Sequence, residues 1–182
     1  MERLASQEGI KLRSRESLSR VGRGTVEGKR VLLALPQTMM NASGEAVAAL
    51  CNSNGIDPSD LCIVFDDVAL PLGTLRLRAR GSAGGQKGMA SILSSLGTTE
   101  VPRLRIGVRG ERYSRQRDLA DYVLEPFAKE ERDAAGESVE RAVEALRVWL
   151  SDGIDAAMKR ANQKPSSPDP ATGVSGDHKV PR

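Results

Sequence analysis

The sequence predicts an α/β fold in a single domain, with a mixed, twisted β-sheet covered by helices on both faces. Apolar runs that are typical of strands alternate along the chain with segments whose apolar residues recur at helical spacing. The run at 61–65 is continuously apolar, as in an interior strand, whereas 129–150 carries a helical stripe. A length of 182 residues, 39% of them hydrophobic, is enough for one domain of ordinary size.

The first half of the chain is expected to contain a helix, a hairpin, a second helix and a strand. Residues 2–8 form the short helix. Residues 18–35 alternate around three glycines and indicate a hairpin whose second strand, 30–35, is buried and is ended by a proline. A serine and a glutamate then open an amphipathic helix at 43–53, two turns follow, and 61–65 is the interior strand.

The second half continues the alternation of strands and helices. Residues 74–80 alternate strictly between polar and apolar, which predicts a half-buried strand with its arginines on one face. The other expected elements are a glycine-rich loop at 81–88, a helix to about residue 95, a strand at 104–109, and helices at 129–150 and 154–162.

The expected domain covers residues 1–162, and 163–182 is expected to be a disordered tail because it holds four prolines and little apolar content. No run of 18 apolar residues occurs, so no transmembrane helix is expected. The first residues lack an apolar signal-peptide core, and Cys51 and Cys62 lack metal-ligand spacing and are typical of buried free thiols. We therefore expect a cytoplasmic protein.

Positive charge is concentrated in one block of the chain. The net charge is only +3, but residues 74–117 carry ten basic and two acidic side chains, whereas 31–73 carry five acidic and no basic ones. This basic block suggests a polyanionic partner such as a nucleic acid. The alternative is that its arginines form solvated strand faces.

The glycine-rich loop at 81–88 leads into a helix, where backbone N–H groups can bind an anion. It departs from the Walker A pattern, because Gln86 stands where glycine is required before Lys87 and residue 88 is neither Ser nor Thr. Residues 22–24 fail the dinucleotide fingerprint as well, so the pattern supports neither a nucleotide nor a nicotinamide cofactor. A tight turn before a helix is the alternative. With one histidine and two cysteines, no zinc site is expected.

Polar residues follow two of the predicted strands. Asp66 and Asp67 come directly after the interior strand, and Asn41 follows the second strand of the hairpin. Sites gather at the carboxyl ends of strands in open α/β sheets, where a carboxylate can orient a base or bind a metal and an amide can position a water. Turn formation and helix capping are the alternatives. His178, the only histidine, lies in the predicted tail and is expected to be an exposed residue.

Several segments, taken in order, resemble bacterial peptidyl-tRNA hydrolase. Residues 29–47 carry Leu-Pro-Gln-Thr-Met-Met-Asn-Ala-Ser-Gly-Glu-Ala-Val, similar to the family's Lys-Pro-Gln-Thr-Phe-Met-Asn-x-Ser-Gly-Glu-x-Val. Residues 63–73 resemble its Val-Val-His-Asp-Asp-x-Asp-Leu-Pro-x-Gly. Residues 75–107 resemble its Gly-Gly-x-Ala-Gly-Gly-His-Asn-Gly loop and its Pro-Arg-Leu-Arg-Ile-Gly run. Residues 122–127 match the start of its closing helical segment, so the resemblance covers nearly all of 1–162.

The resemblance implies hydrolysis of the ester that joins a peptide to the 3′ end of tRNA, which recycles stalled peptidyl-tRNA, without a metal or a cofactor. In this family a histidine acts as base on a water, and a neighbouring aspartate stabilises its basic form. By position, Asp66 matches that aspartate and Asn41 a substrate-contacting asparagine, while Met39 and Met40 stand where Phe and Met line the cleft. The basic block 74–117 is then expected to face the tRNA backbone.

The residues expected to bind substrate or tRNA are Met39, Met40, Asn41, Gln86, Lys87, Arg76, Arg78 and Arg80. Gln86 and Lys87 replace a His and an Asn of the family's loop; Gln86 keeps hydrogen-bonding capacity, and Lys87 adds a charge suited to phosphate. Ala69 also replaces an Asp. The expected partner is tRNA, with no membrane and no metal, and the protein is expected to be a monomer.

The chain departs from the family pattern at its start. The family opens with a strand that lies inside the sheet and ends in Gly-Leu-Gly-Asn-Pro-Gly, followed by Thr-Arg-His-Asn with the catalytic histidine, and residues 1–9 match the helix after it. We therefore expect that segment to be encoded upstream of Met1, the described fold to lack the first strand, and residues 1–182 alone to be inactive on N-blocked aminoacyl-tRNA. The alternatives are a non-catalytic RNA-binding protein of the same fold and an inactive fragment.

Overall fold

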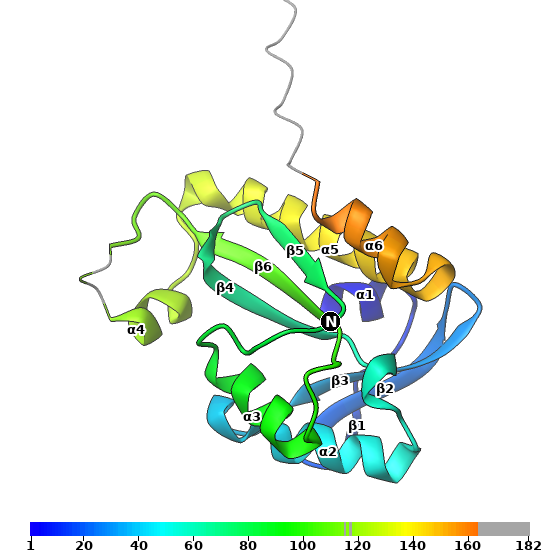
Figure 1. Ribbon diagram of the computed structural model, residues 1–182. Helices are drawn as coiled ribbons and strands as arrows, with labels where there is room; N and C mark the ends of the chain where they lie inside the picture. Colours follow the sequence, from blue (N-terminus) through cyan, green and yellow to red (C-terminus); the bar gives the residue numbers. More distant parts are fainter. Residues whose placement is uncertain (115, 117, 164–182) are drawn as a thin grey trace, which may run out of the picture.

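The computed structural model describes residues 1–114, 116 and 118–163 and has the α/β architecture drawn in Figure 1. Its helices are α1 (Glu2–Gln7), α2 (Ser43–Asn54), α3 (Lys87–Leu96), α4 (Leu119–Leu124), α5 (Arg132–Asp152) and α6 (Ile154–Ala161). Its strands are β1 (Ser14–Glu16), β2 (Ser19–Val26), β3 (Lys29–Pro36), β4 (Ile63–Pro71), β5 (Leu75–Arg78) and β6 (Arg103–Arg109). Short 3-10 turns are η1 (Met40–Ala42), η2 (Pro58–Asp60) and η3 (Lys129–Glu131).

Helices cover the strands on both faces, as predicted. One core layer joins α1, α5 and α6 to the strands, and in it Leu77 and Leu104 pack with Leu146. A smaller layer on the other face joins α2 and α3 to β4 through Val47 and Ile92. Figure 1 shows the strands between these two helical layers. The predicted class is therefore confirmed, because helices pack against the strands from both sides.

The strands form two three-stranded sheets rather than one. The first has the order β1-β2-β3 and is antiparallel throughout; the second has the order β4-β6-β5, with β4 parallel and β5 antiparallel to β6. In the described part of the chain, no strand of one sheet is hydrogen-bonded to a strand of the other. The edge strands β3 and β4 face each other instead across a cavity that both of them line. This arrangement gives the molecule an apolar hollow between two strands.

The hairpin at 18–35 is confirmed as β2 and β3, joined at a tight turn where Glu27 and Gly28 both have positive φ. The prediction that its second strand is buried is wrong. Of the side chains of β3 only Leu33 is fully buried, because the other edge of this strand faces the cavity. The short edge strand β1 was not predicted.

Strand β4 is longer than the predicted 61–65. It runs to Pro71 because half-buried Val68 and Leu70 continue the apolar pattern and β6 supplies a partner as far as Arg109. Asp66 and Asp67 therefore lie within the strand rather than after it, which corrects their expected position. In β5, Leu75 and Leu77 are buried while Arg76 and Arg78 are exposed, as the alternation predicts.

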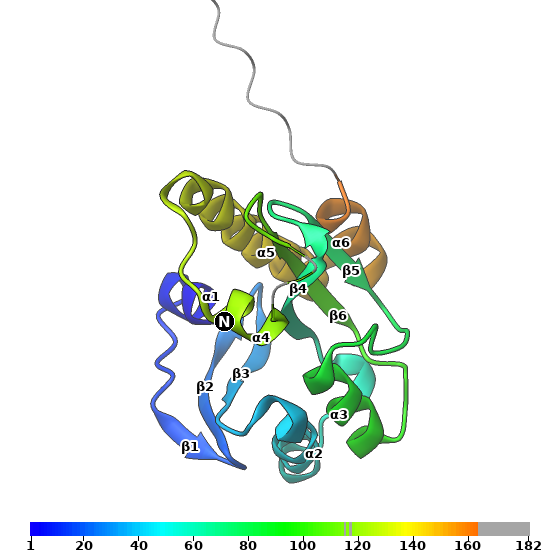
Figure 2. The same cartoon turned by 90° about the vertical axis from the view of Figure 1, so that its left-hand side faces the viewer.

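The C-terminal helices largely follow the prediction. The helix expected from Lys129 begins as η3 and continues as α5, and α6 follows after Gly153. Helix α4 was not predicted as a separate element; Figure 2 shows it in front of the strands, beyond the end of β6. The predicted tail, 163–182, and His178 lie outside the described residues except for Gln163. Within the described part, no helix has the length and apolar character that crossing a membrane requires.

Candidate active site

The cavity between β3 and β4 has a volume of about 810 Å³ and is walled mainly by apolar side chains of β3, β4, α2 and α3. Its polar lining includes Thr38, Asp66 and Gln86, and Met40 and Met89 lie beside them. Of the residues expected to form the site, the cavity brings together Asp66, Met40 and Gln86. A hollow with an apolar wall and few polar groups is the usual form of a site for a small reacting group.

Asp66 and Asp67 point to opposite faces of β4, since successive side chains alternate along a strand. Asp67 accepts a short hydrogen bond from Arg105 of β6, and its second oxygen accepts one from the Ala69 N–H at 2.7 Å. Asp66 is exposed and lines the cavity, and no hydrogen bond or ion pair to it is found within the described part of the chain. The neighbouring ion pair therefore holds β4 against β6 and leaves Asp66 open to a ligand.

The turn η1 and the residue before it, Met39, carry three of the expected binding residues, and these lie in different surroundings. Met40 lines the cavity, whereas Met39 is 77% exposed and Asn41 is also on the surface. Ser43, the first residue of α2, donates a hydrogen bond from Oγ to the Met40 carbonyl at 2.9 Å. The structure thus places Met40 at the edge of the cavity, with 55% of its surface exposed, and Met39 on the outer surface beside it.

The glycine-rich loop ends where predicted, at the start of α3. Gln86 is the N-cap: its Oε1 accepts the Met89 N–H at 2.7 Å, and its Nε2 lies 3.6 Å from the Met40 Sδ. Gly88 allows this approach, since a Cβ there would lie 2.6 Å from the same sulfur. Lys87 is exposed on the first turn of α3. The loop thus joins Gln86 to η1 and presents Lys87 to solvent.

The basic block is not one uniform surface. Arg76 and Arg78 are exposed, and the register of β5 and β6 places them on the same sheet face as Arg103 and Arg105. Arg105 is occupied by Asp67, and Arg103 is buried, with 3% of its surface exposed. The block therefore does not present every arginine to solvent: Arg103 is enclosed, whereas Arg105 keeps 24% of its side-chain surface exposed beside Asp67.

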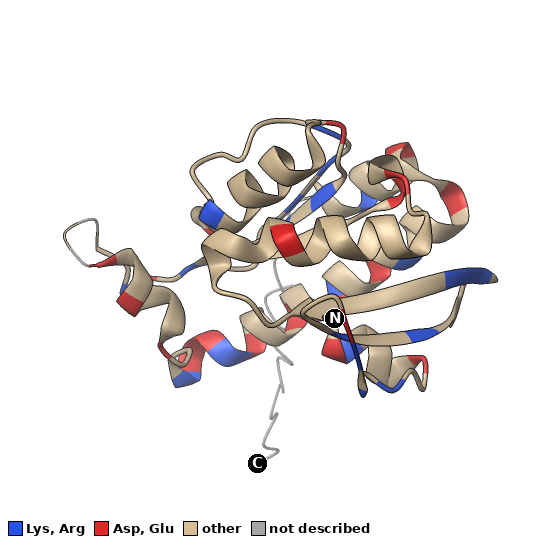
Figure 3. Ribbon diagram, turned by 90° about the horizontal axis from the view of Figure 1, so that it is seen from below, with Lys and Arg blue, Asp and Glu red and all other residues tan. Residues whose placement is uncertain are grey.

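Arg80, the third expected arginine, lies beyond β5 and pairs with Glu100 at 3.5 Å, both side chains being largely exposed. The surface of α2, by contrast, carries Glu45 as its only charge, and Figure 3 shows how charged residues are spread over the molecule seen from below. Lys87, between the cavity-lining residues Gln86 and Gly88, is therefore an exposed cation next to the cavity, whereas the exposed arginines of β5 lie at the far edge of the β4-β6-β5 sheet.

Sequence reasoning missed Thr38. Its side-chain hydroxyl is buried at the cavity and has no hydrogen-bond partner in the described part of the chain, which is uncommon for a buried polar group. The hydroxyl lies in the Pro-Gln-Thr-Met-Met-Asn segment that carries the resemblance, so a signal was present, but nothing in the residue type alone pointed to the cavity.

Both cysteines border the cavity as free thiols, as predicted. Burial raises the pKa of the Cys62 thiol to about 12, although the Leu104 N–H and the charge of Arg103 act against this. Burial raises the pKa of Cys51 as well. In the part of the chain that the structure describes, no group of three or more His, Cys, Asp or Glu side chains could hold a metal.

We expect the free energy of unfolding to fall as the pH rises above the ordinary thiol pKa of 9.0, because the thiol of unfolded Cys62 ionises there while the buried thiol keeps its proton up to about 12. The stability that the buried, protonated thiol contributes is complete below pH 9.0 and is lost as the pH rises to about 12. Urea unfolding at about pH 8 and about pH 10 measures it. Cys62→Val lacks the titrating group and should lose less stability between the two; an equal loss in both proteins contradicts the burial.

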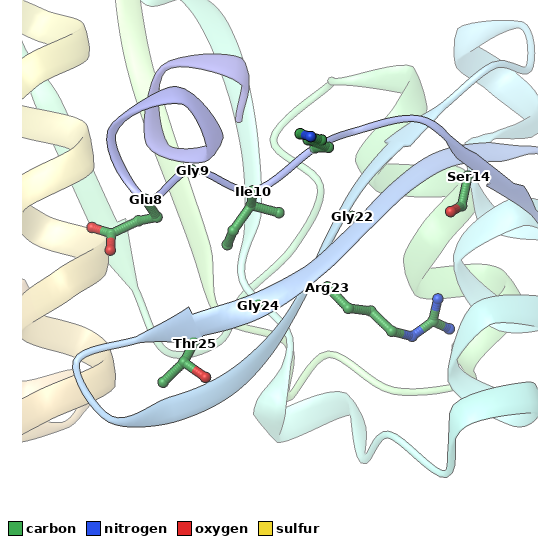
Figure 4. Close-up of a pocket in the computed structure, with 9 residues that line it drawn as sticks. Glu8, Gly9, Ile10, Ser14, Gly22, Arg23, Gly24 and Thr25 are labelled. Atoms are coloured by element: carbon green, nitrogen blue, oxygen red, sulfur yellow. The ribbon is translucent and has the colours of Figure 1, made fainter.

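A second hollow, of about 480 Å³, lies beside β2 and is lined by Lys11, Arg23 and Thr25 among others (Figure 4). Ile10 packs against the glycines of β2, and a Cβ at Gly24 would lie 2.6 Å from its Cδ1. Arg23 is held by Glu16 and Asn54. None of the expected site residues lines this hollow, so the candidate site is the cavity between β3 and β4.

Comparison with known proteins gives consistent matches over this fold. A model of the family described as "Peptidyl-tRNA hydrolase" matches residues 1–169. A peptidyl-tRNA hydrolase of Chloroflexus aggregans is 47% identical over 163 residues, which is 89% of this chain and 86% of that protein. One of Carboxydothermus hydrogenoformans is 43% identical, covering 90% and 86%. The crystal structure of peptidyl-tRNA hydrolase from Acinetobacter baumannii has a TM-score of 0.82 at 29% identity, covering 91% of this chain and 84% of that one.

Proposed function

Because the chain belongs to the peptidyl-tRNA hydrolase family, we propose that the cavity between β3 and β4 receives the reacting end of its substrate and that Asp66 is the carboxylate of its active site. The chain is an ester hydrolase of this family: it acts on the bond between a peptide and tRNA, which recycles stalled peptidyl-tRNA in translation. The observation that carries the role of Asp66 is its position in the cavity without a protein partner in the described part of the chain.

Hydrolysis of an ester by water needs a base that takes a proton from the attacking water. The resemblance assigns this step to a histidine whose basic form Asp66 stabilises. A carboxylate does so by accepting the N–H of one ring nitrogen, which leaves the other nitrogen free to accept the proton and stabilises the imidazolium that forms. No histidine is found among the described residues, and His178 lies outside them.

Asp66 is proposed rather than Asp67 because the two neighbouring carboxylates of β4 have different surroundings. Asp67 is committed to Arg105 and to the backbone of Ala69, so its charge is already compensated. Asp66 faces the cavity from the next position and keeps its carboxylate free for an N–H donor. A carboxylate held on a paired strand is also a rigid acceptor, which a base needs in order to keep its orientation.

We assign the binding of the substrate end to η1 and the start of α3. Asn41 can donate and accept hydrogen bonds through its side-chain amide, and Gln86 stands beside Met40 at 3.6 Å from the sulfur. Exposed Met39 offers an apolar contact at the rim rather than inside the cavity. The esterified end of the tRNA is thus proposed to pass over these two contacting segments into the cavity, with Asp66 beyond them.

The tRNA backbone is proposed to lie along exposed cations of the β5 face and the α3 terminus. Arg76 and Arg78 have no ion-pair partner in the described part of the chain, and Lys87 is exposed nearby on the first turn of α3. Phosphate contacts of this kind supply affinity that does not depend on sequence and falls with salt. Arg80 shares its charge with Glu100 and is the weaker candidate of the three arginines.

We expect the double variant Arg76→Gln/Arg78→Gln to bind deacylated tRNA more weakly and to lower the slope of log affinity against log salt by about one to two, because two phosphate contacts are lost. Filter binding at several salt concentrations measures both quantities. Arg13→Gln/Arg15→Gln is the matched control, since it removes the same charge from exposed positions at and near β1. Equal slopes for the two variants contradict the proposed face.

A second candidate function is RNA binding without catalysis. The observation that favours it is that no imidazole lines the cavity in the described part of the chain. It shares the proposed tRNA face, so tRNA affinity does not separate the two candidates. Release of the N-blocked amino acid from N-blocked aminoacyl-tRNA in the presence of added imidazole does.

We further propose that residues 1–162 form one domain and that the protein acts as a monomer in the cytoplasm. The support for one domain is the continuous core from Leu4 of α1 to Ala161 of α6. The support for the location is the substrate, which is formed during translation. The proposed tail from residue 163 onward lies outside the described residues except for Gln163.

A further inference from the structure

Arg103, the first residue of β6, is a buried cation that is surrounded by backbone carbonyls. Its Nε donates to the Val101 carbonyl at 2.7 Å, and its Nη1 donates to the carbonyls of Gly81 at 2.7 Å and Ser82 at 3.0 Å. Its Nη2 donates to the Thr99 carbonyl at 3.2 Å. No carboxylate forms an ion pair with it within the described part of the chain, so its hydrogen bonds go to backbone carbonyls, while the charge of Glu100 acts on it from a greater distance.

The four carbonyls come from both ends of one excursion of the chain. The segment between β5 and β6 leaves the sheet through Gly81 and Ser82, forms α3, and returns through Thr99 and Val101. A backbone hydrogen bond from the Gly81 N–H to the Thr99 carbonyl, at 3.2 Å, closes the same base. Arg103 therefore ties the entrance of the excursion to its exit.

The guanidinium suits this task because it is planar and carries five N–H donors in a rigid fork. A lysine at the same place has a single nitrogen with three donors, so it cannot bond the carbonyls at the start of the excursion and those at its end together. Burying a charge is costly unless it is compensated, so the contacts of Arg103 must be kept for the fold to be stable. The carbonyl positions of the loop are consequently fixed by the side chain.

The proposed binding residues lie on the same excursion, at the start of α3 and away from the base that Arg103 clamps. Four residues after Ser82, Gln86 caps α3 and lies against Met40, and Lys87 follows it on the surface. The opposite flank of α3 is held to α2, since Ser91 Oγ accepts the Gly44 N–H at 2.9 Å. Between these fixed points, the position of Gln86 and Lys87 depends on how the loop is anchored at its base.

We propose that Arg103 is a positioning residue for substrate binding: by clamping the two ends of the 81–101 excursion it holds Gln86 against η1 and fixes where Lys87 stands on the surface. It touches no substrate itself. The inference rests on the proposed contact of Gln86 and Lys87 with tRNA and goes beyond it, because it assigns a role to an arginine that is buried inside the basic block. Its effect on tRNA affinity runs entirely through the start of α3.

A double-mutant cycle with deacylated tRNA tests this. Arg103→Lys is expected to raise Kd about fivefold in the natural background, and by less than about twofold when Gln86→Ala/Lys87→Ala is also present, because coupled residues give non-additive effects. Arg141→Lys is the matched control: this arginine also holds loop carbonyls, those of Gly73 and Gln163, but not the excursion, and should leave Kd unchanged in both backgrounds. Gly81→Ala, whose Cβ would lie 3.4 Å from Nη1, loosens the same clamp if Arg103→Lys does not fold.

A purely structural role of Arg103 predicts a lower melting temperature with the same Kd, or the same fold-change in Kd in both backgrounds, and either result overturns the inference. The inference is supported if Arg103→Lys has a smaller effect on Kd in the Gln86→Ala/Lys87→Ala background than in the natural one and Gln86→Ala/Lys87→Ala itself binds tRNA more weakly. If Gln86→Ala/Lys87→Ala by itself leaves Kd unchanged, the proposed tRNA contact is wrong and the inference falls with it, so the two failures are told apart by one variant.

Discussion

Added imidazole is expected to give a polypeptide of residues 1–182 measurable turnover of N-blocked aminoacyl-tRNA, and Asp66→Asn is expected to abolish that gain. A positioned base contributes about 10²–10⁴-fold to such a reaction, and a freely diffusing one recovers part of this. The cavity of about 810 Å³ beside Asp66 has room for an imidazole ring. Its N–H can be accepted by the Asp66 carboxylate, which leaves the second nitrogen to take the proton of water.

Release of the N-blocked amino acid, corrected for imidazole without protein, is the measurement. We expect at least about a tenfold gain, at the low end of what a base supplies, rising with pH as imidazole loses its proton. Asp60→Asn is the matched control, since Asp60 lines the same cavity and the same charge is removed. Turnover that needs no imidazole but needs Asp66 shows that another residue of the chain is the base. An unchanged gain in Asp66→Asn shows that Asp66 has no part in the step.

The experiment also separates the two candidate functions. A non-catalytic RNA-binding protein gives no gain with imidazole although it binds tRNA, because its cavity does not hold the ester next to Asp66. A hydrolase site that lacks only its base responds to the added base. Binding and turnover are therefore independent measurements on one protein.

Elements that depend on local pattern were predictable from the sequence. The alternation in 74–80 correctly predicted that Leu77 is buried and Arg76 exposed. Successive side chains of a strand point to opposite faces of the sheet, and only one face of this sheet is covered at β5. The long C-terminal helix, α5, followed from the spacing of its apolar residues in the same way. The place of Asp66 and Asp67 at a predicted strand end already marked both as candidates; the resemblance selected Asp66 of the two and assigned substrate binding to Gln86, and both selected residues line the cavity.

Properties that depend on partners far along the chain were not predictable. The end of β4 is set by pairing with β6, so Asp67 could not be assigned to Arg105 from the sequence. Arg103 looks like any other cation of the basic block, and only the loop carbonyls around it show that it is internal. The burial expected for β3 failed for the related reason that the neighbour of a strand cannot be read from its own residues.

The contact between α2 and α3 depends on Gly44, in the first turn of α2. A Cβ at this position would overlap the Ser91 carbonyl oxygen and lie 2.6 Å from its carbonyl carbon. Backbone atoms cannot rotate away as a side chain can, so the two helices would have to move apart. The same contact carries the hydrogen bond from the Gly44 N–H to Ser91 Oγ at 2.9 Å, which the separation would lengthen.

We therefore expect Gly44→Ala to lower the free energy of unfolding by about 2–3 kcal/mol, the cost of overpacking a close contact. In a chain of this size that corresponds to a fall in Tm of roughly 5–10 °C. Gly136→Ala is the matched control: it also lies in a helix, α5, but a Cβ there meets nothing within 4 Å, so it should gain up to about 1 kcal/mol from helix propensity. Urea and thermal unfolding followed by circular dichroism measure both variants.

The same substitution connects stability to the site. Separation of α2 from α3 moves η1, which precedes α2, away from Gln86, so Gly44→Ala should weaken tRNA binding even at temperatures where it is fully folded. Gly136→Ala should leave the Kd unchanged, because its helix lies in the other layer. If Gly44→Ala is as stable as Gly136→Ala, the helices do not meet at Ser91 as described. A destabilised Gly44→Ala with unchanged Kd would instead mean that η1 and α3 bind tRNA independently of each other.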